Sequence, residues 1–75
     1  MHTSAVTIVG TLWTLTREGS TRRAVLCAIE GYGHELRLEG DSGLLWSRSF
    51  RDGTQVLDLA KETREDFERE GWVAE

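Results

Sequence analysis

The chain has 75 residues, of which 39% are hydrophobic and 29% charged, and its formal net charge is −4. This length provides one domain, residues 1–75, with a two-layer core and no room for a buried cavity of ligand size. We therefore expect a non-enzymatic protein with no catalytic residues and no cofactor. The net charge disfavours the strongly basic class of nucleic-acid-binding proteins.

Cys27 is the only cysteine in the chain, which excludes an intramolecular disulfide. One cysteine and two histidines at unrelated spacings do not form a zinc ligand set, so no metal is expected. The first residues lack the basic and apolar regions of a signal peptide, and no apolar run approaches the ~18 residues of a membrane span. These features predict a cytoplasmic protein without a membrane partner.

Turns that contain glycine divide the first fifty residues into four short runs typical of β-strands. The runs cover residues 6–17, 21–30, 34–39 and 44–51. Each connection has the length of a hairpin loop, and short connections favour an antiparallel meander in the order 1-2-3-4. The first run is rich in Val, Ile, Thr and Trp, which fit a pleated surface better than a helix.

A helical period replaces the strand pattern after Asp52. The apolar stripe consists of Val56, Leu59, Ala60, Thr63 and Phe67. This spacing predicts a helix over about residues 53–70, with Asp52 and Gln55 forming a capping box at its start. At its end, Gly71 is expected in a left-handed conformation, with Trp72 folded back onto Phe67. The predicted fold class is α+β, a two-layer ββββα arrangement with the C-terminal helix packed on one sheet face.

The first two strands are apolar on both sides, so a single helix cannot cover all of their apolar surface. In the second strand Val25 and Cys27 alternate with Ala24 and Leu26. In the first, one face carries Val9, Trp13 and Leu15 and the other Ile8 and Leu12, while the fourth places Leu44, Trp46 and Phe50 on one side. Because large apolar patches are uncommon on monomers, a second copy or another protein is expected to cover the surplus.

The predicted interaction surface combines apolar side chains with arginines. Its residues are Trp13, Leu15, Arg17, Arg22, Arg23, Trp46 and Arg48. The leading hypothesis is a protein that acts by protein–protein contact, either as a homodimer or as a subunit or regulator of a larger assembly. Charge is uneven: residues 1–51 carry six Arg against five acidic residues, whereas residues 52–75 carry three basic residues against eight acidic ones.

Two other functions compete with this hypothesis. Tryptophans interleaved with arginines on an open sheet are typical of single-stranded nucleic-acid binding, and the ββββα order resembles, as a topology, the repeat of the Pur and Whirly-like single-strand binders. This alternative gains if the tryptophans are exposed and loses if the helix buries them. A nucleophilic pair of Cys27 and His34 ranks lower, because a cysteine in the middle of a strand is usually a small core residue. The carboxylates of the helix, such as Asp58 and Glu62, are expected to form a solvated face.

Overall fold

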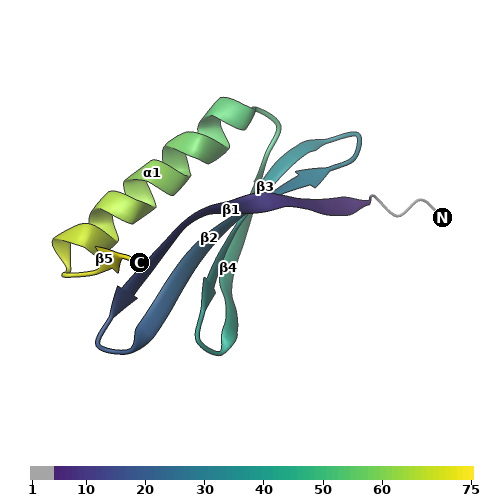
Figure 1. Ribbon diagram of the computed structural model, residues 1–75. Helices are drawn as coiled ribbons and strands as arrows, with labels where there is room; N and C mark the ends of the chain where they lie inside the picture. Colours follow the sequence, from purple (N-terminus) through teal and green to yellow (C-terminus); the bar gives the residue numbers. More distant parts are fainter. Residues whose placement is uncertain (1–4) are drawn as a thin grey trace.

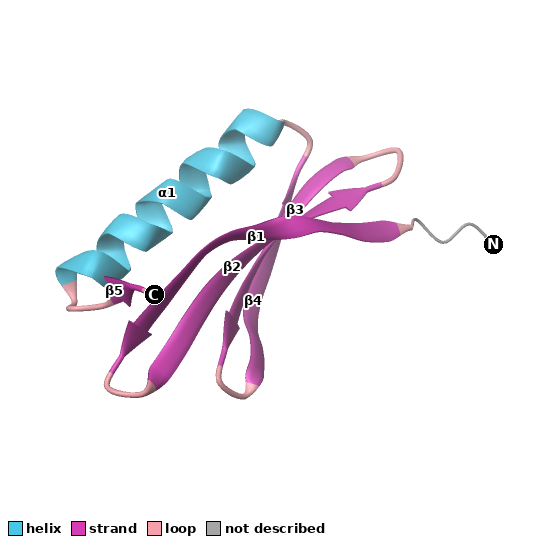
Figure 2. Cartoon of the chain, viewed as in Figure 1, coloured by secondary structure: helices cyan, strands magenta, loops and turns pink. Residues whose placement is uncertain are grey.

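A computed structural model describes residues 5–75 of the chain. Its elements are β1 (Val6–Arg17), β2 (Ser20–Ile29), β3 (Gly33–Gly40), β4 (Gly43–Phe50), α1 (Gly53–Arg69) and β5 (Val73–Ala74). One antiparallel sheet carries the helix on one face (Figures 1 and 2). The predicted α+β class and the ββββα order are confirmed. No helix among residues 5–75 is long and apolar enough to cross a membrane.

The strands lie in the order β4-β3-β2-β1-β5. The four long strands form a meander, whereas β5 pairs with the outer edge of β1 only at Leu15 and Thr16. β5 has no signal in the sequence, because two residues are too few to show an alternating pattern. Beyond β5, the N-terminal half of β1 extends away from α1 (Figure 1).

The core lies between α1 and the sheet. Its buried residues are Trp13, Leu15, Ala24, Leu36, Leu38, Val56, Ala60 and Trp72. Leu59 and Phe67 pack against this cluster, so the predicted stripe of the helix does face the sheet. The Trp13 indole Nε1 donates a hydrogen bond to the Ala60 carbonyl over 2.9 Å, which satisfies the polar atom of a buried tryptophan and links α1 to β1.

Both ends of α1 have local causes. The Asp52 carboxylate accepts a hydrogen bond from the Thr54 amide over 2.8 Å, as expected of an N-cap. The Gln55 side chain, which was expected to complete a capping box with Asp52, instead lines a groove beside the helix. At the other end Gly71 has a φ of 96° and Trp72 lies edge-to-face on Phe67, as predicted. The amide nitrogens of Trp72 and Gly71 donate to the carbonyls of Phe67 and Glu68 respectively, which is the Schellman pattern.

Irregularities in β1 and β4 change the faces expected from strict alternation. In β1 the register shifts between Ile8 and Gly10 and again between Thr11 and Trp13, so Val9 and Leu12 are extra residues. Alternation is interrupted at both residues, so it no longer groups Val9 with Trp13. A further shift in β4 leaves Leu45 without a partner and pairs Leu44 with Glu39, on the face opposite Trp46 and Phe50. The expectation that Leu44 shares their face is wrong, because one inserted residue reverses the alternation.

Candidate interaction surfaces

The apolar members of the predicted surface lie in or against the core. Trp13 is 8% exposed and Leu15 is fully buried, both under α1, and Trp46 is half-buried against the same cluster. The Phe67 ring lies 6.2 Å from Trp13 in an edge arrangement and helps to cover it. The surface predicted from sequence is therefore corrected at Trp13 and Leu15, because the helix takes the face that these two side chains share.

The arginines of the predicted surface do not gather into one patch. Arg22 lies over the Trp72 ring, 4.7 Å from its centroid, and Arg48 over the Phe50 ring at 5.4 Å. Both belong to the helix-bearing face, as do their partners in the sheet register. Arg23 points to the opposite face, with a guanidinium nitrogen 3.7 Å from the Glu39 carboxylate, and Arg17 is exposed at the end of β1.

The face without the helix buries two residues by itself. Val25 and Cys27 are buried there although no helix covers them. Arg37 and Glu35 are two positions apart on β3, so their side chains lie on this same face. The Arg37 Nε donates a 2.6 Å hydrogen bond to the Glu35 carboxylate, which raises the pKa of Arg37. Burial raises the pKa of the Cys27 thiol, with Arg37 opposing that shift. The thiol is therefore protonated and poorly nucleophilic near neutral pH.

Cys27 and His34 do not form a nucleophilic pair. Cys27 pairs with Glu35 on the open face, whereas His34 pairs with Phe50 on the helix-bearing face, so the sheet separates the two side chains. The Nδ1 atom of His34 is buried without a hydrogen-bond partner near the start of α1, beside Gly53. Within residues 5–75, no group of three or more potential metal ligands is present.

The most apolar exposed region follows the N-terminal half of β1. We define the β1 patch as Val6, Ile8, Val9 and Leu12, whose exposed fractions run from 37% for Leu12 to 66% for Ile8. The outer edge of β1 pairs with β5 only at Leu15 and Thr16, so no strand of residues 5–75 pairs with it across the patch. The sequence pattern had pointed to this strand, but mainly to its buried half. A better signal was the complete lack of charged residues from position 5 to 16.

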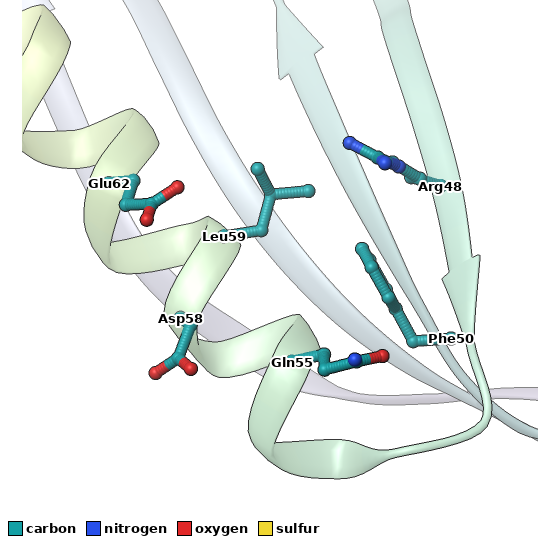
Figure 3. Close-up of a pocket in the computed structure, with 6 residues that line it drawn as sticks. All are labelled: Arg48, Phe50, Gln55, Asp58, Leu59 and Glu62. Atoms are coloured by element: carbon teal, nitrogen blue, oxygen red, sulfur yellow. The ribbon is translucent and has the colours of Figure 1, made fainter.

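A second surface is an open groove between α1 and β4, which we call the α1–β4 groove. Its volume is about 370 Å³ and its lining residues are Arg48, Phe50, Gln55, Asp58, Leu59 and Glu62. Figure 3 shows Phe50 and Leu59 projecting into the space between the strand and the helix. Asp58 and Glu62 stand one turn apart on the helix and form no ion pair within residues 5–75. The groove thus has an apolar floor and an acidic helical side.

The chain was compared with protein-family models, curated proteins and solved structures. No family model, curated protein or solved structure matches the chain. The β1 patch and the α1–β4 groove are therefore the features that indicate a function.

Proposed function

We propose that this protein is a non-enzymatic cytoplasmic protein that acts by protein–protein contact, as a homodimer joined through the β1 patch. The observation that carries the proposal is an edge strand with no charge from residue 5 to residue 16 and with four exposed aliphatic side chains. Soluble monomers usually protect such an edge with charged side chains, proline or a covering loop. The bulges at Val9 and Leu12 hinder strand pairing along this edge, but they leave the four aliphatic side chains exposed, and a second copy would cover these side chains.

The size of the patch fits a reversible dimer. Weighted by their exposed fractions, its four side chains amount to about two fully buried aliphatic residues per protomer. Burying them in both protomers would contribute roughly 6–12 kcal/mol at ~1.5–3 kcal/mol for each side chain. Association costs ~4–15 kcal/mol in lost translational and rotational freedom, so the patch supports an affinity in the micromolar range only with further contacts at its rim.

The geometry of β1 favours a twofold contact in which side chains dominate. Bulges at Val9 and Leu12 interrupt the regular ladder and increase the local twist of the strand. An uninterrupted strand pairing between two copies is therefore disfavoured. Two β1 patches that meet across a twofold axis can still pack apolar side chains against each other, and their lack of charge leaves no repulsion to overcome.

Sedimentation velocity of the chain at tens of micromolar tests the proposal, with Ile8→Glu as the variant and Leu57→Glu as the matched control. Leu57 is also aliphatic and is 50% exposed, but it lies on α1 away from the patch. We expect a mass of about twice 8.5 kDa for the unmodified chain and for Leu57→Glu, and a monomer for Ile8→Glu. A monomer at every concentration, or equal masses for both variants, would refute the homodimer.

The alternative function, single-stranded nucleic-acid binding, receives less support. Its stacking platform required exposed tryptophans, but α1 covers Trp13 and Trp46 is half-buried. Arg22 and Arg23 also project to opposite faces, which divides the positive charge. Fluorescence anisotropy with a labelled oligothymidine tests this alternative, because tight binding that weakens with salt would favour it over the homodimer.

A further inference from the structure

We propose that the α1–β4 groove binds an extended segment of another protein, which adds to β4 as a further strand and presents a basic, an apolar and a second basic side chain at alternate positions. The proposal is independent of the dimer, because it concerns the other edge of the sheet. It rests on three features of the groove: an open backbone edge, a helix flank beside that edge, and unpaired carboxylates on the flank.

The backbone edge is available along β4. This strand is the last in the order β4-β3-β2-β1-β5, so within residues 5–75 no strand pairs with its outer side. From Trp46 to Phe50 its pairing with β3 is regular, and the only irregularity lies at Leu45. Five regular residues without proline offer main-chain donors and acceptors to an incoming strand. Main-chain pairing of this kind is a common mode of peptide recognition.

The helix lies beside this edge and gives the added strand a specific environment. Arg48 and Phe50 of β4 line the groove together with Gln55 and Leu59 of α1 (Figure 3). A new strand would lie ~4.8 Å beyond β4, and every second side chain would point toward the helix-bearing face. Those side chains would enter the groove, so its lining would select them.

The lining selects an apolar residue between two basic ones. Phe50 and Leu59 provide the apolar contact for a side chain such as leucine. Asp58 and Glu62 form no ion pair within residues 5–75 and stand about 6 Å apart along the helix axis. Two basic residues that flank the apolar one are about 13 Å apart along an extended peptide, so their long side chains would converge on the two carboxylates. The surrounding charge agrees, because residues 52–75 carry three basic residues against eight acidic ones and so attract a basic segment.

A second copy of this chain fits the groove poorly. The β4 strand of a second copy would present Trp46, Arg48 and Phe50 to the groove at alternate positions, which is the reverse of an apolar residue between two basic ones. The other open edge, along the β1 patch, has no basic residue between positions 5 and 16 to meet Asp58 or Glu62. The chemistry of the groove therefore points to a different protein.

The test uses the full-length chain and a labelled seven-residue peptide in which threonine alternates with lysine, leucine and lysine. Binding is followed by fluorescence anisotropy. We expect the peptide to bind, and to bind at least about tenfold more weakly when its lysines are replaced by glutamate or when its ladder amides are N-methylated. Glu62→Arg should weaken binding about tenfold. The matched control Glu65→Arg makes the same charge change at an exposed position outside the groove and should alter it less than about twofold.

Circular dichroism of both variants shows whether each remains folded. Arg48→Gln removes a cation from the groove and should strengthen the binding of the lysine-containing peptide. The proposal is overturned if the N-methylated peptide binds as well as the parent, or if the Glu62 and Glu65 variants weaken binding equally, since general electrostatic attraction would then explain the result. Absence of peptide binding also overturns it. So does a dimer that persists in Ile8→Glu and is lost on Ser49→Pro, because a second copy would then occupy β4.

Discussion

Replacing Phe67 by alanine should remove the main attachment between the end of α1 and the sheet. The ring is half-buried and lies between two tryptophans, 6.2 Å from Trp13 and 5.5 Å from Trp72, with an edge-to-face geometry in both pairs. Trp72 in turn carries the guanidinium of Arg22 on its ring. Loss of Phe67 therefore exposes Trp13 and removes the surface that holds Trp72 after the helix ends.

The expected loss of stability is about 2–4 kcal/mol. A fully buried phenylalanine costs ~3–5 kcal/mol on truncation to alanine, and partial burial reduces this figure. Each aromatic pair contributes ~0.5–1.5 kcal/mol beyond area burial, which keeps the loss of Phe67 large for a half-buried residue. A domain of 75 residues has a free energy of unfolding of only about 4–11 kcal/mol. The substitution should thus lower Tm by roughly 10–25 °C.

Thermal and urea unfolding, followed by circular dichroism, measure this loss. Leu57→Ala is the control, because Leu57 is an exposed aliphatic residue of the same helix and its truncation should cost less than about 0.5 kcal/mol. Tryptophan fluorescence gives a second readout, since Trp13 and Trp72 should become more solvated in the Phe67 variant. If Phe67→Ala and Leu57→Ala melt within a few degrees of each other, the helix end does not hold the core together as argued.

Three further predictions concern the caps and the thiol. Gly71→Val should destabilise the fold by about 1–3 kcal/mol in urea unfolding, and Gly71→Asn should destabilise it by less, because the φ of 96° strains a β-branched residue. A steric clash would not explain the loss, since an added Cβ meets nothing closer than Arg17 Nε at 3.7 Å. Asp52→Ala should cost about 1 kcal/mol by thermal unfolding and Asp52→Asn much less, since asparagine can still accept from the Thr54 amide; equal losses would contradict the N-cap. Burial raises the pKa of Cys27, so the folded chain holds the thiol proton more tightly than the unfolded chain. The resulting contribution to the free energy of unfolding is complete below the ordinary thiol pKa and is lost as the pH rises through the raised pKa. The urea midpoint of the parent should therefore fall more steeply at alkaline pH than that of Cys27→Ala, and parallel curves would argue against a desolvated thiol.

The strands, the helix and the helix ends can be predicted from the sequence, because they depend on interactions between neighbours in the chain. Glycine-containing turns separate the four strands, and the structure places them in the predicted meander. The stripe that includes Val56 and Phe67 identified the buried side of the helix. Gly71 and Trp72 marked its end through a motif of six residues, and the Asp52 carboxylate marked its start.

Which apolar surface is covered depends on contacts between distant parts of the chain and therefore cannot be predicted from local patterns. Strict alternation assigns Leu44 to the wrong face and cannot place Val9, because bulges in β1 and β4 depend on how neighbouring strands twist and pair, which no local sequence pattern predicts. From the sequence, the helix could cover either face of the sheet. It packs on the face of Trp13, which buries this residue and leaves the β1 patch exposed. The α1–β4 groove likewise exists only because the flank of α1 comes beside the edge of β4, and this arrangement joins residues that lie apart in the chain.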